Sequence, residues 1–243
     1  MSSYCRTCRA ELPAQARFCG KCGTASRSHA RSVVARGQQE RSEVLRAALA
    51  FGWVCVGTFV AMLVVASFVG DQDPWSSVLW DAAGMAMVGL CAAGIRGSWR
   101  ESMPLGLSWQ WLVAAGIGAA MSMVFGIAYV GVLSGGHREP SELPGAPVIV
   151  AVVVLAPLFE EWLCRGVAWR AAAAMANPQA AWLLTSILFA FLHGLGGNYL
   201  LELPHRAFAG LVFGWLRWRS GSLVPGVVAH ALHNAAAVLQ FGG

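Results

Sequence analysis

Seven apolar stretches after residue 45 constrain the fold of this chain most strongly. A helix needs about 20 apolar residues to cross the roughly 30 Å hydrocarbon core of a bilayer, and most of the seven are that long. Charged residues make up only 12% of the 243 residues, against roughly 25% in soluble domains. We therefore predict an all-α polytopic membrane protein whose approximate spans are 46–70, 76–96, 108–134, 146–172, 178–198, 204–219 and 222–240.

Two Cys-x2-Cys pairs precede these spans: Cys5, Cys8, Cys19 and Cys22. Pairs of thiolates at this spacing close tetrahedral four-cysteine zinc sites. A segment of this length cannot bury a core by itself, so metal ligation would supply its folding energy. Arg9 occupies the position after the first pair where a glycine is common in zinc ribbons. We predict a structural zinc ribbon over residues 1–25, with two disulfides in an oxidising compartment as the alternative.

Basic residues are concentrated at the N-terminal end, where nine of the 17 Lys and Arg residues precede Ala47. Residues 26–45 show little apolar periodicity and predict a flexible basic linker along anionic lipid headgroups, followed by a transmembrane domain at 46–243. Because Lys and Arg collect on the cytoplasmic side, we expect a multi-pass protein of the cell membrane with its N-terminus in the cytoplasm. An odd number of spans leaves the C-terminus outside. No nucleic-acid motif accompanies the charge, so no nucleic acid is expected as a partner.

Three charged residues interrupt the fourth span, in Leu155-Ala-Pro-Leu-Phe-Glu-Glu-Trp-Leu-Cys-Arg-Gly166. Ionisable groups near a bilayer centre cost roughly 2.5 to 3.5 kcal/mol each, so they usually pair, face a wet cavity or mark a functional site. Glu161 and Arg165 are four apart, with the acid first, which suits a helical ion pair. Glu160 lies about 100° around the helix and is the carboxylate left over. A purely structural charge network is the alternative interpretation.

The fifth span brings a histidine to the depth of these acids. Folding the chain about Asn177-Pro178 places Glu161, sixteen residues before the turn, opposite His193, sixteen residues after it. Phe189 lies one helical turn before His193 on the same face and predicts an apolar wall beside it. Without the acids, a histidine in such a span is more often a hydrogen-bonded helix contact than a catalytic group.

The last span contributes a second histidine and an amide. His230 and Asn234 are four apart and project from one face, whereas His233 points toward a different neighbour. An unpaired carboxylate, two imidazoles and an amide are sufficient for hydrolysis, with the carboxylate taking a proton from water and the other groups stabilising an oxyanion. Glu160 and the two histidines at 193 and 230 could equally hold a divalent metal such as zinc with an open fourth position.

Three motifs occur in a fixed order on separate predicted helices: Glu160-Glu161-x3-Arg165, Phe189-x3-His193 and His230-x3-Asn234. Together they resemble the signature of the CPBP family, also called the Abi family. That family comprises type II CAAX prenyl endopeptidases and bacteriocin-processing or immunity proteins. The resemblance covers residues 147–238 and leaves the first three spans and the ribbon outside.

The resemblance implies an intramembrane endopeptidase in which Glu160 activates water with His193 as its partner. His230 and Asn234 would stabilise the oxyanion, and the ion pair that follows Glu160 would be structural. The family is described both as a metalloprotease and as a metal-independent glutamate protease, and the sequence does not choose. The implied substrate is a peptide or membrane protein, prenylated or not. A non-catalytic immunity or scaffold protein of the same fold is the alternative; a transporter would predict pseudo-repeated halves, and no internal repeat is seen.

Overall fold

The computed structural model describes residues 3–13, 16–69, 74–96, 100–133, 143–193 and 203–241. Its contacts divide the chain into two compact units, Met1–Leu45 and Arg46–Gly243. The first unit contains a two-stranded antiparallel sheet in which β1 (Ser3–Tyr4) pairs with β2 (Glu11–Leu12), with Tyr4 opposite Glu11. The small sheet and the turn between its strands bring the cysteines together.

The two Cys-x2-Cys segments fold into knuckles of the same construction. In the first, the backbone N–H of Arg9 donates to the carbonyl of Cys5 at 3.0 Å, and in the second Gly23 donates to Cys19 at 2.8 Å. Arg9 and Gly23 therefore occupy equivalent positions, and both have a positive φ, of 56° and 72°. The left-handed conformation costs a residue with a Cβ roughly 1 to 2 kcal/mol. Arg9 thus stands at a position that favours glycine.

Helix α1 (Arg27–Val69) is continuous over 43 residues, so residues 27–45 are helical where the sequence predicts a flexible linker. Ser26 precedes the helix, and its hydroxyl oxygen accepts a hydrogen bond from the backbone N–H of His29 at 3.3 Å. Such a cap fixes the first turn. The segment has no proline and is rich in Ala, Arg, Gln and Glu, which are good helix formers. Its polarity reflects exposure to water, and the helical propensity of its residues decides its conformation.

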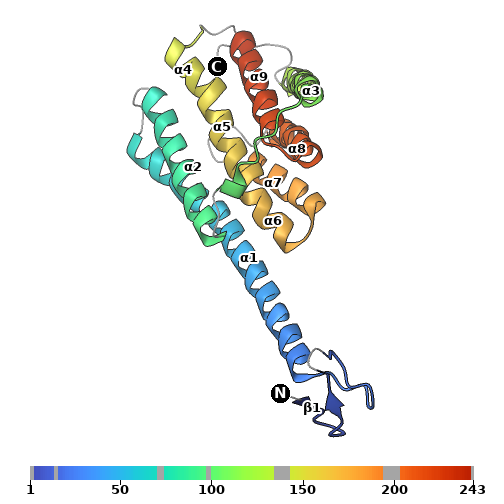
Figure 1. Cartoon of the computed structure of the whole chain (residues 1–243). Coiled ribbons are helices and arrows are strands. Elements are labelled where there is room, and N and C mark those ends of the chain that lie inside the picture. Colours follow the sequence, from blue (N-terminus) through green and yellow to red (C-terminus); the bar gives the residue numbers. More distant parts are fainter. Residues whose placement is uncertain are drawn as a thin grey trace. The chain divides into compact units, whose positions relative to one another are not determined.

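The second unit is all-helical, and with α1 the described residues contain seven helical rods (Figure 1). Three helical stretches are long and apolar enough to cross a membrane, Ala35–Val64, Trp109–Leu133 and Ala146–Met175, and two shorter apolar ones are Ala82–Ile95 and Pro178–His193. Residues 194–198 of the predicted fifth span lie outside the described residues. The remaining rods and one 3-10 turn are α2 (Pro74–Arg96), η1 (Arg100–Ser102), α3 (Trp109–Leu133), α7 (Pro178–His193), α8 (Leu203–Ser220) and α9 (Val224–Phe241).

The helical rod Ala146–Met175 contains two π-helical stretches between α-helical parts. Its successive parts are α4 (Ala146–Val150), the π-helical η2 (Ala151–Leu155), α5 (Ala156–Glu161), the π-helical η3 (Trp162–Ala168) and α6 (Trp169–Met175). Pro157 has no N–H to donate, which favours a disturbed turn on its N-terminal side. The two wide turns flank the pair of acidic residues. Single π turns inside α-helices occur frequently at functional sites.

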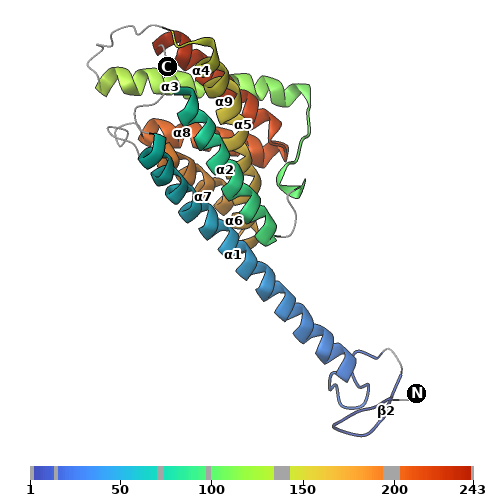
Figure 2. The same ribbon diagram turned by 90° about the vertical axis from the view of Figure 1, so that its left-hand side faces the viewer.

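This broken rod is packed on several sides. It contacts α2 through α5 and η3, α7 through η3 and α6, and α9 through η2 and α5. Figures 1 and 2 show α2 running beside it, and α8 and α3 complete the bundle by packing on α7 and α9. Gly210 of α8 permits close approach to α7, because a Cβ there would lie 3.0 Å from the carbonyl oxygen of Ser186. The acids are therefore enclosed by other helices.

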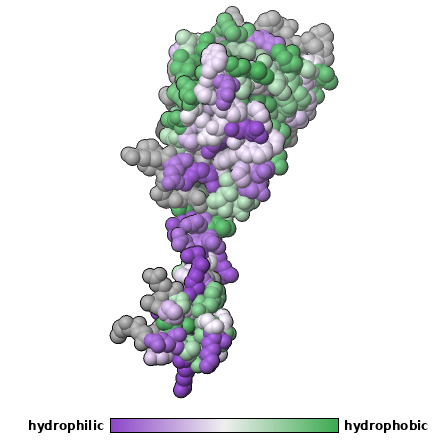
Figure 3. All heavy atoms as spheres, turned by 45° about the vertical axis from the view of Figure 1, so that its right-hand side comes forward, coloured by the Kyte–Doolittle hydropathy of each residue, from purple (hydrophilic) through white to green (hydrophobic). Residues whose placement is uncertain are grey.

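The surface of the second unit is apolar, as expected for a protein that faces lipid. Large apolar side chains stand exposed on successive helices, including Val56, Leu90, Val124 and Phe191. Hydrophobic residues cover much of the face of this unit seen in Figure 3. Exposed apolar patches of this extent are rare on soluble monomers. Together with the apolar helices, they show that the chain is a polytopic membrane protein.

Candidate active site and zinc site

A buried ion pair holds the second unit together at its centre. The guanidinium of Arg165 donates from Nη1 to Glu161 Oε1 at 2.9 Å, as the four-residue spacing predicts, and from Nη2 to the carbonyl of Gly210 at 2.8 Å. Both side chains are fully buried. A buried pair needs additional hydrogen bonds to offset its desolvation. The Gly210 carbonyl supplies one of them and ties the broken rod to α8.

Glu161 has a second partner that the sequence does not predict. Its Oε1 lies 3.2 Å from Nδ1 of His230 on α9. A carboxylate paired with arginine accepts hydrogen bonds, so Nδ1 of His230 carries the proton. The ring is also stacked on Phe213 at 4.9 Å between centroids. Glu161 therefore fixes the orientation of His230 in addition to balancing Arg165.

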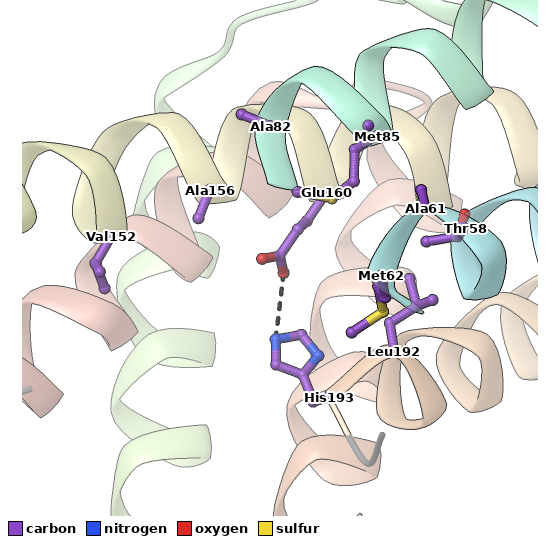
Figure 4. Close-up of a pocket in the computed structure, with 11 residues that line it drawn as sticks. Thr58, Ala61, Met62, Ala82, Met85, Val152, Ala156, Glu160, Leu192 and His193 are labelled. Carbon is purple, nitrogen blue, oxygen red and sulfur yellow. Dashed lines mark ion pairs between the residues drawn. The ribbon is translucent and has the colours of Figure 1, made fainter. Parts of the chain in front are cut away.

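Glu160 faces both predicted histidines. Its Oε2 lies 3.4 Å from Nε2 of His193 and 3.8 Å from Nε2 of His230. Figure 4 shows the Glu160 carboxylate and the His193 ring pointing toward one another from two different helices. The Glu160 side chain is 14% exposed, in contrast to fully buried Glu161. The three helices that carry the motifs thus bring one carboxylate and two imidazoles together.

Hydrogen bonds at Nδ1 of His193 and His230 determine whether the Nε2 atom of each ring faces Glu160 as a donor or as an acceptor. Nδ1 of His193 lies 2.8 Å from the carbonyl oxygen of Phe189, which can only accept, so Nδ1 carries the proton there too. In their neutral forms, both rings then direct an acceptor Nε2 at the carboxylate. Three acceptors facing one another require a proton or a donor between them. A water molecule with two hydrogens satisfies this requirement and is polarised by it.

Phe189 forms the apolar wall that its spacing predicts. It is buried, and its ring centroid lies 4.6 Å from the His193 ring and 5.3 Å from the His230 ring. The Arg165 guanidinium carbon lies 4.5 Å from the same centroid. The Phe189 ring therefore contacts the Arg165 guanidinium and both imidazole rings, and it limits the orientations that the two imidazoles can adopt.

Asn234 holds α9 against the π turn that precedes the acids. Its Nδ2 donates to the carbonyl of Val152 at 2.9 Å. Within the rod, the N–H of Ala156 donates to Ala151, and Pro157, the next residue, has no N–H to offer. One amide hydrogen of Asn234 is therefore committed to the backbone, and the second remains for other partners.

His233 lies away from this cluster, as its position on the helix predicts. Its Nδ1 is 2.9 Å from Oγ of Ser122 on α3, and its ring lies 5.3 Å from that of His205. It thus contacts α3 and α8 and not the acids. The distinction between His230 and His233, three residues apart, follows from the helical period.

Two glycines of the site were not singled out from the sequence. A Cβ at Gly226 would lie 2.9 Å from Glu161 Oε2, so only glycine leaves room for that carboxylate. Gly210 plays the same part beneath Phe189, where a Cβ would lie 3.2 Å from the ring. The signal for the first was present, since Gly226, His230 and Asn234 repeat every four residues on one face of α9.

The four N-terminal cysteines form the second site. Their ligand atoms lie within 4.8 Å of one another, and the Cys5–Cys22 and Cys8–Cys19 sulfurs are each 3.5 Å apart. Tetrahedral zinc with Zn–S bonds of about 2.3 Å separates its ligand sulfurs by about 3.8 Å. The Thr24 side chain and backbone lower the pKa of the Cys22 thiol to about 6, which favours the thiolate that binds metal. The cluster fits a zinc ion.

The acidic site and the cysteine cluster differ in how closely their possible metal ligands lie. Among the residues that the structure describes, only the four cysteines form a group of three or more possible ligands whose ligand atoms all lie within 4.8 Å of one another. Glu160, His193 and His230 face a common space but do not form such a group.

No curated protein and no solved structure matches this chain. Residues 142–236 match the family model described as type II CAAX prenyl endopeptidase Rce1-like, which covers less than half of the chain. The matched segment contains all three motifs from Glu160 to Asn234 and begins within a few residues of the resemblance predicted from the sequence. The resemblance is thereby confirmed: residues 142–236 are similar to type II CAAX prenyl endopeptidases of the Rce1-like kind.

Proposed function

We propose that this protein is an intramembrane endopeptidase that hydrolyses a peptide bond with water activated by Glu160. The observation that carries the proposal is the approach of one carboxylate oxygen to two imidazole Nε2 atoms, at 3.4 and 3.8 Å. A cavity of about 220 Å³ opens beside Glu160 and His193 and has room for water and part of a substrate. The similarity of residues 142–236 to a peptidase family supports the same chemistry.

The reaction begins with a water molecule between Glu160 and the imidazoles. Glu160 takes one proton as the water oxygen attacks the scissile carbonyl carbon. The C–N bond then breaks as that proton passes to the leaving amine nitrogen, with Nε2 of His193 as the relay. The products are one new carboxyl group and one new amine. His193 suits this role because the Phe189 carbonyl holds its Nδ1 proton in place.

Stabilisation of the oxyanion falls to His230 and Asn234. Nε2 of His230 can donate when its ring carries both protons, and the negative charge of Glu161 then compensates the ring. Asn234 retains one amide hydrogen after its bond to Val152. Removal of one oxyanion donor typically lowers kcat by about 10²- to 10³-fold. His230→Ala and Asn234→Ala are expected to lower kcat by that order.

The substrate that we propose is a peptide or membrane protein presented at the bilayer, with prenylated CAAX-type sequences as the first class. Processing of a bacteriocin precursor is the second class that the resemblance raises. Both offer an extended segment near the membrane surface. Peptides with and without an S-prenyl cysteine distinguish the two classes.

The decisive experiment is a cleavage screen with purified protein in detergent or lipid nanodiscs. The peptides are prenylated and unprenylated, each is incubated with and without a chelator, and products are identified by mass spectrometry. Glu160→Gln should abolish cleavage and retain the fold, because Gln is isosteric and cannot take the proton. Retained cleavage by this variant would overturn the proposed base. Cys5→Ser combined with Cys8→Ser serves as the chelator control, since the pair should remove the ribbon's metal independently of any ion at the acidic site.

A non-catalytic membrane immunity or scaffold protein is the second candidate. The observation in its favour is the chain of buried contacts from Arg165 through Glu161 to His230, which stabilises a helix bundle without chemistry. Under that function Glu160→Gln would leave the cellular phenotype intact. Under the peptidase function it would remove the phenotype at unchanged protein level.

We further propose that the N-terminus lies in the cytoplasm and the C-terminus outside the cell membrane. Residues 1–45 carry eight Lys and Arg against three acids, whereas residues 46–243 carry nine of each. Excess Lys and Arg mark the cytoplasmic side. A fluorescent-protein fusion at the N-terminus and an alkaline-phosphatase fusion at the C-terminus should both be active. If alkaline phosphatase were active only at the N-terminus and the fluorescent protein only at the C-terminus, this orientation would be contradicted.

A further inference from the structure

The cavity beside Glu160 is apolar apart from its catalytic end. Eleven residues line it, and eight of them are Ala, Gly, Val, Leu or Met. The polar exceptions are Glu160, His193 and Thr58, and the Thr58 hydroxyl is turned to its own helix, where it donates to the carbonyl of Val54 at 2.6 Å. Figure 4 shows Met62 and Leu192 beside the space between Glu160 and His193, with Met85 near Glu160. The cavity therefore combines a reacting end with an apolar enclosure.

Two helices outside the matched segment supply most of this enclosure. Helices α1 and α2 contribute six of the eleven lining residues: Thr58, Ala61, Met62, Ala82, Gly84 and Met85. The family match begins only at residue 142. The two helices are closely packed, since a Cβ at Gly84 would lie 3.2 Å from Cβ of Ala61. The catalytic groups thus come from the matched segment, and much of the pocket wall is contributed from outside it.

The size of the cavity limits what it can hold. A cavity of about 150 Å³ accommodates benzene, which has six carbons, so each carbon takes roughly 25 Å³. The volume of about 220 Å³ therefore suits about nine carbons. Any apolar amino-acid side chain fits within that limit. A chain much longer than this does not fit in the cavity as it stands.

Resting on the peptidase function proposed above, we propose that this cavity receives an apolar side chain adjacent to the scissile bond, and that Met62 and Met85 set its size. Water held by Glu160 must approach the scissile carbonyl carbon to about 3 to 3.5 Å. A side chain on either side of that bond is then within reach of the cavity. The residue class selected next to the cleaved bond is accordingly apolar and of limited bulk.

The two methionines are suited to this role. They stand on α1 and α2, both are partly buried, and both line the cavity. Methionine is flexible and fills irregular spaces, so it can adapt to side chains of similar size. Its replacement by alanine removes three heavy atoms and would enlarge the cavity by roughly 75 Å³. Ala82→Leu acts in the opposite direction, because Ala82 lines the same space.

The test measures kcat/KM for peptides that carry valine, leucine, phenylalanine or naphthylalanine on each side of one fixed bond. Met62→Ala and Met85→Ala should raise the ratio of the naphthylalanine to the valine peptide by at least about tenfold, since a single methylene in such a pocket changes specificity by about 10- to 200-fold. Ala82→Leu should lower the same ratio. Loss of fold alone cannot shift the ratio in opposite directions.

The controls are exposed apolar residues on the same two helices. Met87 on α2 is 63% exposed and Leu63 on α1 is 53% exposed, so Met87→Ala and Leu63→Ala should leave the ratio within about twofold of wild type. If Met85→Ala and Met62→Ala do no more than these controls, the pocket assignment is overturned. Cleavage by the wild type would in that case still support the peptidase.

A binding measurement separates failure of the pocket from failure of the enzyme. Fluorescein-labelled forms of the same peptides are bound to Glu160→Gln protein, alone and combined with Met85→Ala or Met87→Ala, and followed by anisotropy. If wild type cleaves none of the peptides but Met85→Ala shifts the affinity order toward larger side chains, the pocket stands and the peptidase function falls. If binding is insensitive to the side chain, or the peptides do not bind, the pocket proposal is refuted.

Discussion

Glu160 and Glu161 are adjacent carboxylates whose surroundings differ completely. Glu161 is fully buried between Arg165 and His230, whereas Glu160 is 14% exposed and opens on a cavity. The four-residue spacing to Arg165 selects Glu161 for the ion pair. The 100° step along the helix then turns Glu160 toward α7. One residue type thus has a structural role at one position and a proposed chemical role at the next.

Glu161→Gln is expected to destabilise the protein far more than Glu160→Gln. Removing the charge of Glu161 leaves Arg165 buried without its counter-ion, and breaking a buried pair in this way costs about 3 to 5 kcal/mol. Glu160 is less enclosed, with a side chain 14% exposed beside two imidazoles, so its replacement should cost less, below about 1 kcal/mol. Denaturant unfolding in detergent, followed by circular dichroism, measures both. Equal destabilisation by the two variants would contradict this division.

Arg9→Gly is expected to stabilise the zinc ribbon. Arg9 has φ of 56° in a knuckle where the equivalent residue is Gly23, and relief of that strain is worth roughly 1 to 2 kcal/mol. Zinc affinity should rise about tenfold, measured by competition with a chromophoric chelator. Gly23→Ala should lower it by a similar factor.

Arg6→Gly is the matched control for this change. Arg6 is also exposed in the first knuckle region, but φ is positive at Arg9 alone among the described non-glycine residues. Arg6→Gly removes one positive charge, as Arg9→Gly does, but it relieves no backbone strain. A gain in affinity equal to that of Arg9→Gly would point to charge and against the backbone explanation.

At the scale of elements, the broken rod shows how a helix interior can create a binding position for a neighbour. Pro157 has no N–H to donate to the preceding turn, and Asn234 from α9 donates to the Val152 carbonyl there. This contact anchors α9 near the acids. The π turn on the other side, η3, begins directly after Glu161. The local irregularities therefore coincide with the point where three helices meet.

The Asn234 contact should depend on Pro157. Asn234→Ala is expected to cost about 1 kcal/mol, because it removes a hydrogen bond to a partly buried carbonyl. Pro157→Ala restores a backbone N–H that can bond this turn, so Asn234→Ala should cost less in that background. A double-mutant cycle of unfolding free energies gives the coupling. Additive effects would show that Val152 finds another partner.

At the scale of the whole molecule, the chain consists of two units with different sources of stability. The helices of residues 46–243 bury side chains against one another, with a core that includes Trp162, Phe189 and Phe213. The ribbon buries only a few residues, chiefly Cys5, Leu12 and Cys19. A core that small cannot offset the entropy of folding without a metal.

Zinc removal should therefore unfold the ribbon and spare the helices. We expect purified protein to contain about one zinc ion per chain by mass spectrometry. Chelation should make residues 1–25 sensitive to protease while most of the helical circular dichroism remains. Cys5→Ser combined with Cys8→Ser should abolish zinc content, and Cys91→Ser, outside the ribbon, should not. Loss of most helical signal on chelation would contradict the independence of the units.

The sequence by itself determined the helical rods and the two Cys-x2-Cys knuckles, and it predicted the polar residues of the candidate site. Apolar length, Cys-x2-Cys spacing and the four-residue repeats of Glu161 with Arg165 and of His230 with Asn234 are local patterns, and local backbone geometry suffices to interpret them. Low hydrophobicity in residues 27–45 predicts a flexible linker, whereas the segment is helical in the structure. Propensity was the better guide in that segment.

Only the tertiary structure decided how these residues share their contacts. His230 meets Glu161, Asn234 meets Val152, and Met62 and Met85 close the cavity beside Glu160. These pairs are far apart in the sequence, and their approach depends on how the helices pack. Packing is set by small residues such as Gly226 and Gly210, whose missing side chains leave space that no local pattern specifies. Periodicity fixes the face on which a side chain lies, but the packing of all the helices fixes what it meets.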